Sequence, residues 1–472
     1  MSFNIPRNGK KRIVVVGGGF GGLNLCRALK DSGYQVVLVD KNNFHQFPPL
    51  IYQVATSGLQ PNAITFPFRK LFEDRKDFYF RLAELRSVHP EENYIQTSIG
   101  KLDYDYLVLA MGATTNFFGS EHLAENAIAM KTIDEAMGLR NALLSNFERS
   151  VTCASPEERQ ELLNVVIVGG GPTGVEIAGA IAEMRRYILP TDYPDLDVNN
   201  MHIHLIQGDD RLLPAMSEKA SRKAYDFLKE LGVEIETGKF IVDYVDHKAV
   251  FSDGRTLPTR SFIWVCGVRG QSVTGLERER FGHGGRLKVD AYNRVIGERN
   301  IYAIGDLCLM QGTDPEYRHG HPQMAQPAIQ QGLNLAENFR ALLKGGNVRK
   351  FTYRDLGSMA TIGRNKAVAD VMGSHFTGFF AWLMWMGVHL ISILGVRNKV
   401  AVFLDWAWSY FTYDKSNRMI LMAKKPRVLL EREEREKVSH WGVQSPPVIP
   451  AENPGAQAVS AHARKIRENP PS

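Results

Sequence analysis

The sequence predicts an α/β protein with two Rossmann-like domains, one inserted in the other, followed by an amphipathic C-terminal region. Three observations lead to this fold class. A strand, a glycine-rich turn and a helix occur twice, at residues 11–29 and 165–184, and this arrangement is typical of the start of a Rossmann-like domain. Further apolar strands lie on both sides of the second copy. After residue 376 the composition becomes apolar and rich in tryptophan.

The first copy begins with an apolar strand at 11–16 and continues into the glycine turn 17–22. In such a turn one glycine allows the sharp bend, one lets the backbone approach a pyrophosphate, and one lets the helix pack against the strand. The N–H groups and dipole of the helix N-terminus attract the phosphates. The next strand, 34–40, ends in Asp40, where an acceptor for a ribose hydroxyl is expected.

The second copy has the strand 165–168, the glycine turn 169–174 and a helical run at 175–184. A single glycine turn is a weak signal, but two turns in the same strand–turn–helix context predict two dinucleotide sites. The matching second strand, 202–207, ends in Gln207 instead of an acid. Charged residues follow directly after it, namely Asp209, Asp210 and Arg211.

Three more strands are predicted at 105–110, 261–266 and 300–306. Their order along the chain predicts that one nucleotide domain is inserted within the other. The expected division is 10–120 with 290–345 for the outer domain, 121–289 for the inserted domain, 346–426 for a C-terminal region, and 427–472 for a charged, disordered tail.

Composition excludes several other classes of protein. The chain has 472 residues, of which 44% are hydrophobic and 23% charged, with a net charge of +6, so a dedicated nucleic-acid binder is not expected. The four cysteines, Cys26, Cys153, Cys266 and Cys308, are scattered without a CxxC pair. This spacing argues against a disulfide scaffold, a zinc ribbon and a dithiol redox pair, and we expect no metal site. No secretory signal is apparent at the N-terminus.

The C-terminal region has the composition of a membrane-associated segment. Residues 378–395 contain only two polar side chains, His389 and Ser392, and a second apolar run follows at 400–410. Four of the six tryptophans lie here, at Trp382, Trp385, Trp406 and Trp408. A bilayer-spanning helix and a buried core helix are alternatives. We favour two helices that lie in the membrane interface, separated by a break at residues 397–399.

The net charge of the chain is concentrated in the same region. Residues 364–427 contain nine Lys and Arg residues and three acids, an excess of six that equals the charge of the whole chain. A basic, tryptophan-rich surface suits an anionic membrane leaflet.

With these motifs in place, the chain resembles the type II NADH dehydrogenases, single-subunit NADH:quinone oxidoreductases that do not pump protons and have two dinucleotide-binding domains. The resemblance covers about residues 12–422. Its markers are the segments Gly17–Leu23, Phe44–Thr56, Gly169–Glu176, Asn300–Asp306 and Ala325–Gly332.

The resemblance implies FAD, held non-covalently by the outer domain, and NADH or NADPH as substrate of the inserted domain. By motif, the FAD contacts are Gly17, Gly19, Phe20, Gly21, Gly22, Asp40, Lys41, His45, Leu85, Gly112, Asp306, Ala325, Gln326 and Lys366. The nucleotide contacts are Gly169, Gly171, Thr173, Gly174, Glu176, Gln207 and Arg211.

The resemblance further implies that Glu176, Gln326, Gln330 and Lys366 take part in catalysis. For Glu176 the alternative is a first-turn glutamate that only favours the helix dipole. Gln326 and Gln330 are four residues apart and share one helix face, so they can donate to quinone carbonyls or lie on an exposed face. A cation such as Lys366 beside the flavin would stabilise its reduced, anionic ring.

Gln207 leaves the choice of nucleotide open. A neutral amide does not repel a 2′-phosphate, and Arg211 can pair with one, which predicts the use of NADPH. Alternatively, Asp209 or Asp210 supplies the missing acid, and NADH remains the dominant substrate.

The expected partners are a membrane quinone and the bilayer surface, on the cytoplasmic face of the cell inner membrane, and the resemblance allows a homodimer. A sulfide:quinone oxidoreductase shares this architecture but needs cysteines paired near the flavin. A membrane-associated flavoprotein redox sensor is an alternative of another class, although a sensor needs no quinone motif.

Overall fold

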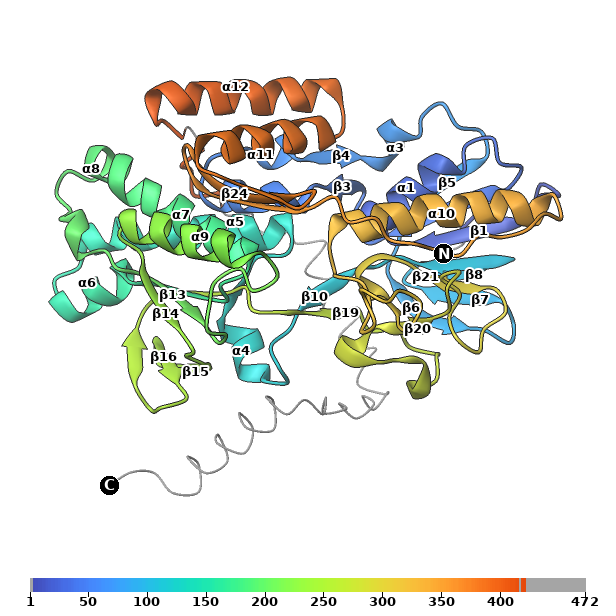
Figure 1. The fold of residues 1–472 in the computed structure, drawn as a ribbon, viewed down its shortest axis with the longest axis horizontal. Coiled ribbons are helices and arrows are strands. Elements are labelled where there is room, and N and C mark those ends of the chain that lie inside the picture. The colour runs from blue at the N-terminus through green and yellow to red at the C-terminus, as the bar shows by residue number, and fades with distance from the viewer. Residues whose placement is uncertain (1–2, 416, 422–472) are drawn as a thin grey trace.

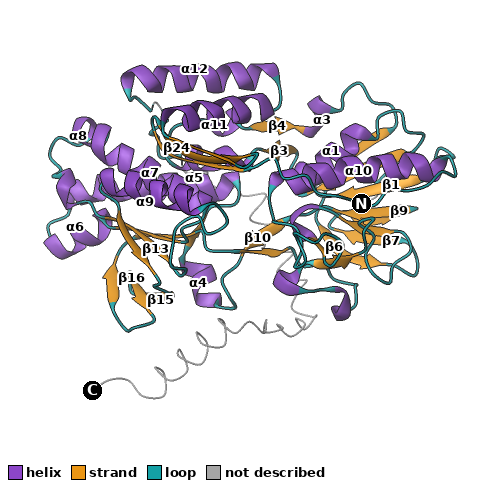
Figure 2. Ribbon diagram, viewed as in Figure 1, coloured by secondary structure: helices purple, strands orange, loops and turns teal. Residues whose placement is uncertain are grey.

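The computed structural model describes residues 3–415 and 417–421, so the predicted tail at 427–472 lies outside the described residues. Two domains, each built on a parallel sheet, lie side by side (Figure 1). A third layer, made of a small sheet and the helices α11 and α12, lies across the top of both domains. Figure 2 shows the same arrangement by secondary structure, with helices above the strands of each domain.

The first sheet has the strand order β21-β9-β1-β2-β5, and its neighbouring strands are all parallel. Its strands are β1 (Arg12–Val16), β2 (Gln35–Asp40), β5 (Phe78–Leu82), β9 (Tyr106–Leu109) and β21 (Ile301–Ala303). Helices α1 (Phe20–Ala28) and α10 (Ala325–Leu343) contribute Leu25 and Phe339 to the core on one face of the sheet. Strands buried on both faces read as continuous apolar runs, which explains why the sequence predicted them.

The second sheet has the order β11-β18-β12-β13-β14 and is also parallel throughout. Its strands are β11 (Ile128–Ala129), β12 (Val165–Val168), β13 (Ile203–Gln207), β14 (Glu234–Thr237) and β18 (Ser261–Trp264). Its principal helices are α5 (Ile133–Thr152), α7 (Pro172–Tyr187) and α9 (Glu218–Glu230). Because β21 completes the first sheet after β18 has completed the second, the two sheets are nested along the chain as predicted. The predicted domain limits stay a prediction.

Smaller elements extend both domains. The remaining strands are β3 (Phe44–Gln46), β4 (Thr65–Pro67), β6 (Leu85–His89), β7 (Tyr94–Thr97), β8 (Gly100–Asp103), β10 (Ala113–Thr115), β15 (Ile241–Val245), β16 (Lys248–Phe251), β17 (Thr256–Pro258), β19 (Val268–Gly270), β20 (Leu287–Val289) and β22 (Cys308–Met310). The remaining helices before the top layer are α2 (Ile51–Ala55), α3 (Phe68–Leu71), α4 (Glu121–Asn126), α6 (Pro156–Leu163) and α8 (Leu189–Asp192). Strands β10 and β19 pair antiparallel where the chain crosses between the two domains.

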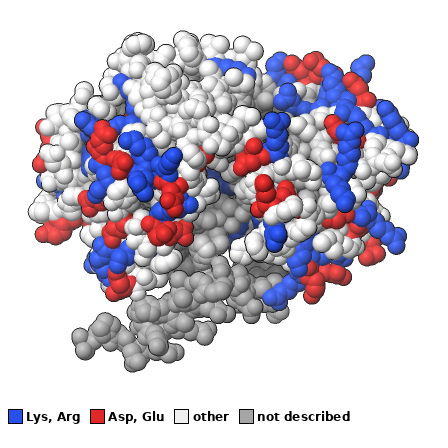
Figure 3. Space-filling model, in the orientation of Figure 1, with Lys and Arg blue, Asp and Glu red and all other residues white. Residues whose placement is uncertain are grey.

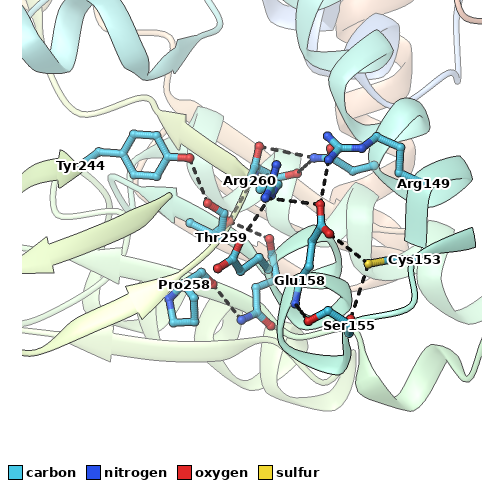
Figure 4. Close-up of polar contacts among 12 residues, drawn as sticks. Arg149, Cys153, Ser155, Glu158, Tyr244, Pro258, Thr259 and Arg260 are labelled. Carbon is cyan, nitrogen blue, oxygen red and sulfur yellow. Dashed lines mark hydrogen bonds and ion pairs between the residues drawn. The ribbon is translucent and has the colours of Figure 1, made fainter. Parts of the chain in front are cut away.

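A polar network fastens α6 to the second sheet (Figure 4). Glu158 in α6 forms ion pairs with Arg149, at 3.0 Å, and with Arg260, at 3.4 Å, and accepts a contact from the Cys153 thiol at 3.3 Å. The Thr259 hydroxyl donates to Asn164 O at 2.6 Å, and Thr259 O accepts from Tyr244. The network joins α6 to the starts of the inner strands β12 and β18, at the end of the sheet opposite the second glycine turn, and so stabilises the domain.

The top layer contains the antiparallel strands β23 (Ser358–Gly363), β24 (Lys366–Val371) and β25 (Ser374–Thr377), followed by α11 (Phe379–Ser392) and α12 (Val396–Thr412). Strand β23 lies directly on α7, where a Cβ on Gly179 would come within 1.7 Å of Ile362 O. The predicted break at 397–399 was wrong, because these residues form the first turn of α12 and the chain turns at 393–395, where Gly395 has φ +79°. Within 3–415 and 417–421, no helix is long and apolar enough to cross a bilayer.

Candidate active site

The first glycine turn has the geometry of a phosphate cradle. Gly17 has φ +102°, and a Cβ on it would lie 2.4 Å from Ala110 O. A Cβ on Gly22 would lie 1.9 Å from Gly17 O, so the helix can pack here only with glycine. Gly19 precedes α1 without a side-chain cap, and no atom lies within 4 Å of the position of its Cβ. The uncapped N–H groups of the α1 N-terminus therefore face an open space, as the binding of a pyrophosphate requires.

The second glycine turn repeats this geometry. Gly169 has φ +114°, and a Cβ on Gly174 would lie 1.8 Å from Gly169 O. Gly171 precedes α7 without a side-chain cap, and the space at its Cβ position is open. Thr173, the second residue of α7, lies at the same helix N-terminus. The two predicted phosphate-binding turns therefore have matching backbone shapes.

Each turn is closed by a side chain from the next strand. Asp40 Oδ2 accepts a hydrogen bond from Gly18 N at 2.6 Å, and Gln207 Oε1 accepts one from Gly170 N at 2.7 Å. Burial raises the pKa of the Asp40 carboxyl, and hydrogen bonds from Asn42 and Gly18 offset part of that rise. Gln207 thus takes over the structural task of the expected acid without its charge.

The other predicted FAD contacts differ in how deeply they are buried. His45 is buried and donates from Nδ1 to Gly18 O at 2.9 Å, so it supports the turn from behind, next to Phe20. Burial lowers the pKa of His45, which favours the neutral ring. Lys41 is exposed, and Leu85 is half-buried in β6. Gly112 has φ +71° and open space at its Cβ position.

The segment around Asp306 is fixed by residues that the sequence analysis did not name. Gln331 Oε1 accepts from Gly305 N at 2.7 Å, and Lys131 Nζ lies 3.5 Å from Asp306 Oδ2. Gln323 donates to Asp306 O at 2.9 Å. Gln331 lies within the predicted Ala325–Gly332 motif, so the motif was a signal for it. Lys131 had no sequence signal.

The side chains of Gln326 and Gln330 are hydrogen-bonded to the backbone of a neighbouring segment. Gln330 donates to Arg354 O at 2.8 Å and accepts from Arg354 N at 3.0 Å. Gln326 donates to Gly357 O and accepts from Leu356 N, both at 3.2 Å. The two side chains share one face of α10, as predicted. Both amides hold the segment 354–357, which leads into β23. Ala325 is the first residue of α10.

Lys366 lies at the start of β24 and points toward the inserted domain. Its Nζ is 2.5 Å from Glu230 Oε1 and 5.5 Å from the centroid of the Phe227 ring, both on α9. These contacts lie on the inserted domain, and the expected position of Lys366 beside the flavin stays a prediction. Arg211 likewise uses its guanidinium on the carbonyls of Pro214, at 2.7 Å, and Met216, at 3.0 Å.

A cavity of about 120 Å³ lies between α2, α7, the β23–β24 turn and the helices α11 and α12. We call it the aromatic cavity. Seven aromatic side chains line it, namely Tyr52, Tyr187, Trp382, Trp385, Trp406, Tyr410 and Tyr413. Trp406 donates to Gln53 Oε1 at 2.8 Å, and Gln53 donates to the Tyr52 hydroxyl at 2.8 Å. This wall comes from the predicted Phe44–Thr56 motif and the tryptophan-rich segment, which are far apart in sequence.

Glu176 is the acid of the aromatic cavity. It lies in the second turn of α7, and the first turn of α7 contains no acidic residue, which weakens the helix-dipole alternative. Burial raises the pKa of Glu176 from its ordinary 4.5 to about 8, and the Thr361 amide and the Trp385 indole offset only part of that rise. The indole Nε1–H of Trp385 is buried and makes no hydrogen bond of normal geometry. At neutral pH the protonated form of the Glu176 carboxyl is therefore favoured, and the Trp385 indole lies beside it.

A basic group lines the same cavity. Burial lowers the pKa of the Lys415 ammonium, and Glu183 opposes that effect. Glu183 Oε1 in turn accepts from Arg364 N at 2.6 Å. The cavity thus contains an acid and a base whose pKa values both move toward neutrality, a pattern found at sites of proton transfer.

The outer faces of α11 and α12 are apolar and exposed. The exposed fractions are 73% for Phe380, 75% for Ile391, 79% for Val396 and 81% for Phe411. Figure 3 shows few charged side chains over these two helices at the top of the molecule. A contiguous exposed apolar surface of this kind marks an interaction site.

The cysteines do not form a second redox centre. All four are free, and Cys26 and Cys308 are buried. Burial raises the pKa of both thiols, which keeps them protonated and unreactive. In the described residues no group of His, Cys, Asp and Glu side chains is arranged to hold a metal.

Comparisons with known proteins show which family the chain resembles. Residues 11–332 match the family model of pyridine nucleotide-disulphide oxidoreductases, and residues 356–412 match the NDH2 C-terminal domain. A type II NADH:quinone oxidoreductase of Mycobacterium tuberculosis is 33% identical over 85% of this chain and 89% of its own length.

Solved structures share the fold. NDH2 of Plasmodium falciparum, solved with NADH, matches with a TM-score of 0.79 and 24% identity, over 88% of this chain and all of that one. A sulfide:quinone oxidoreductase of Aquifex aeolicus matches with a TM-score of 0.65 and 17% identity, over 94% of this chain and 98% of that one. The extent of the family match and the 33% identity place this chain: it belongs to the type II NADH:quinone oxidoreductase family, within the pyridine nucleotide-disulphide oxidoreductase group.

Proposed function

We propose that this enzyme oxidises NADH and reduces a membrane quinone by two electrons, without proton pumping, and that the quinone head group binds in the aromatic cavity. The observation that carries the proposal is the cavity itself. It joins α7, which begins at the second glycine turn, to the apolar helices α11 and α12, and it holds the protonated carboxyl of Glu176. A site for a quinone needs both access from the bilayer and a source of protons.

The first glycine turn fits FAD, held without a covalent bond. The open space at Gly19 and the uncapped N-terminus of α1 would receive the pyrophosphate. Asp40 and the exposed Lys41 would lie by the adenosine ribose. The segment Gly305–Leu307 and the N-terminus of α10 would lie toward the ring end. When bound, the flavin supplies an acceptor for the hydride of the nicotinamide nucleotide and a donor of the same two electrons to the quinone.

The second glycine turn fits the reduced nicotinamide nucleotide. Gly171 leaves room for its pyrophosphate, and α7 offers its uncapped N-terminus. Because the two turns belong to adjacent domains, the two dinucleotides would meet with their reactive ends between them. The domains position the rings, and the chain itself needs no nucleophile for the transfer.

The aromatic cavity suits a quinone for physical reasons. Flat aromatic walls favour a flat ring by stacking. The neutral Glu176 carboxyl and the Trp385 indole N–H beside it are both donors, and a quinone offers two carbonyl acceptors. Reduction to the quinol takes up two protons. Glu176 can release one from its carboxyl, and Lys415 in the same cavity can release the second from its ammonium group.

In this proposal Gln326 and Gln330 act indirectly. Their amides hold the segment 354–357, which sets the position of β23 and hence of Thr361 beside Glu176. We therefore propose a positioning role for both glutamines, in place of the direct contact with quinone that the sequence predicted. For Lys366, the ion pair with Glu230 supports a role in docking the top layer onto α9.

The exposed faces of α11 and α12 would lie in the membrane interface. Apolar side chains along both helices would enter the bilayer, and Arg397 and Lys399 would remain at the level of the lipid headgroups. We propose a peripheral protein in this arrangement, and its place on the cytoplasmic face of the cell inner membrane stays a prediction. The homodimer stays a prediction, which sedimentation velocity in detergent can test.

The experiment is a steady-state assay of the purified protein together with a spectrum of the bound cofactor. We expect a flavin spectrum, release of FAD on denaturation, and rapid NADH-dependent reduction of a soluble quinone. Absence of flavin, or reduction of the flavin by NADH without quinone turnover, would contradict the proposal. The second outcome would favour the redox-sensor alternative.

A further inference from the structure

We infer that the carboxylate of Asp209, oriented by Gln207, binds the adenosine ribose of the nucleotide and excludes nucleotides that carry a 2′-phosphate. The inference rests on the proposed binding of NADH at the second glycine turn. It assigns selectivity to a residue two positions beyond the end of β13, where the sequence had left the choice between NADH and NADPH open.

Gln207 connects the glycine turn to Asp209. Its side chain is buried, with only 6% exposed. Its Oε1 accepts from Gly170 N at 2.7 Å, and its Nε2 donates to Asp209 Oδ2 at 2.6 Å. An amide can make both contacts because it carries an acceptor and a donor. A glutamate at this position would instead repel the Asp209 carboxylate.

Asp209 is also fixed through the backbone. Gly238 N donates to Asp209 O at 2.8 Å, and Lys239 N donates to Gln207 O at 3.1 Å. The Asp209 side chain is exposed, and its Oδ1 accepts no hydrogen bond from any described residue. One oxygen is thus held by the protein while the other is free for a ligand.

The charge of Asp209 lies at the crevice between the carboxyl ends of the strands. Its field reaches Cys266, two residues after the end of β18, where burial and then Asp209 raise the pKa of the thiol to about 11. Cys266 also borders the second glycine turn, since a Cβ on Gly169 would lie 3.0 Å from Cys266 Cα. This crevice is where parallel α/β sheets bind their nucleotides.

No cation pairs directly with that carboxylate in the described residues. Asp209 forms no ion pair with any residue of 3–415 or 417–421. Arg211 is bound to the carbonyls of Pro214 and Met216, and Lys239 pairs with Asp253 at 3.1 Å. A 2′-phosphate would therefore meet an uncompensated carboxylate, whereas a 2′-hydroxyl would donate to it.

The first domain shows the contrast. There Asp40 accepts from the glycine turn through Oδ2 and from Asn42 N through Oδ1, at 2.7 Å, so a single residue closes the turn and brings the charge. In the second domain the two tasks are divided between Gln207 and Asp209. With Gln207 in place of the expected acid, the negative charge lies two residues further along the chain, at Asp209.

The test measures the affinities of the holoenzyme for ADP-ribose and for its 2′-phosphate by calorimetry. These ligands lack the nicotinamide, so their binding is independent of flavin and quinone chemistry. We expect the wild type to favour ADP-ribose and Asp209→Asn to shift the ratio about 10- to 100-fold toward the phosphate, the range for a hydrogen bond to a charged group. Asp210→Asn, an adjacent exposed acid, is the matched control and should leave the ratio unchanged.

Gln207 is a positioning residue and is tested by a double-mutant cycle. Gln207→Met should shift the ratio in the wild-type background and have no further effect on it in Asp209→Asn. A merely structural role would lower both affinities alike in both backgrounds.

A ratio within twofold of wild type in Asp209→Asn, or an equal shift in Asp210→Asn, would overturn the inference. Neither result bears on the proposed function, which the NADH:quinone turnover assay tests separately. Failure of the wild type to bind either ligand would instead contradict the nucleotide site itself, and the inference with it.

Discussion

The substitution Glu176→Gln tests the electrostatics of the aromatic cavity. Burial raises the pKa of this carboxyl from 4.5 to about 8, and each pKa unit corresponds to about 1.4 kcal/mol. Ionising Glu176 in the folded protein therefore costs up to about 5 kcal/mol, and water in the cavity would reduce that cost. Glutamine keeps the shape of the neutral acid and cannot ionise.

The sign of the pH dependence follows from linkage. The folded protein holds the proton more tightly than the unfolded chain, so stability falls as the pH rises from about 4.5 to about 8 and is constant above that range. We expect the wild type to lose stability between pH 5 and pH 9, and Glu176→Gln to lose up to about 5 kcal/mol less over the same range.

The assay is unfolding of the FAD-loaded enzyme in detergent at a series of pH values, followed by tryptophan fluorescence. Glu125→Gln, which changes an exposed glutamate in α4, is the control and should follow the wild type. Infrared spectra provide an independent readout, because a protonated-carboxyl band present at pH 7 should be absent in Glu176→Gln. Parallel pH profiles for wild type and Glu176→Gln, with no such band, would refute the reasoning.

Three further predictions concern the cradle, the α10 motif and the membrane surface. Gly19→Ala should fold, because the space at its Cβ is open, but it should purify with less FAD, judged by absorbance, because the pyrophosphate needs that space. Gly22→Ala should not fold, because its Cβ would lie 1.9 Å from a carbonyl oxygen. Gln331→Leu should lower stability by about 1–3 kcal/mol in denaturant titrations, because it leaves a buried N–H without an acceptor; an unchanged midpoint would contradict this. Phe403→Ser should weaken vesicle binding about 10- to 100-fold, in line with about 1.5–3 kcal/mol per buried side chain. Leu82→Ser, which changes an equally exposed residue on β5, should leave vesicle binding unchanged.

The fold was predictable because its signals are local. Strands buried on both faces give continuous apolar runs, and a positive-φ turn next to a helix N-terminus selects glycine at fixed spacing. The duplication of these signals predicted both sheets and their nesting. The turn between α11 and α12 was misplaced because the polar residues 397–399 resemble a break, although the helix satisfies two of them by tertiary contacts. Asn398 is buried and donates to Thr65 O at 2.9 Å, and Lys399 donates to Ile391 O at 2.6 Å.

The candidate site was predictable only in part, because it depends on contacts between distant segments. Helical spacing placed Gln326 and Gln330 on one face, but nothing local indicates that 354–357 covers that face. For Lys366, nothing local indicates the ion pair with Glu230 on α9. The loss of an acid at Gln207 was visible in sequence, whereas the recruitment of Asp209 depends on how the loop after β13 folds.

The central claim is that quinone is reduced in the aromatic cavity. Ala180 lines the cavity and is buried on α7, so Ala180→Phe should fill much of its volume, and Ala180→Ser is the matched control. Stopped-flow absorbance separates the reduction of the bound flavin by NADH from its reoxidation by a soluble quinone. We predict that Ala180→Phe keeps the wild-type rate of flavin reduction and loses rapid reoxidation by quinone, while Ala180→Ser keeps both. Reoxidation of Ala180→Phe at the wild-type rate would contradict the claim.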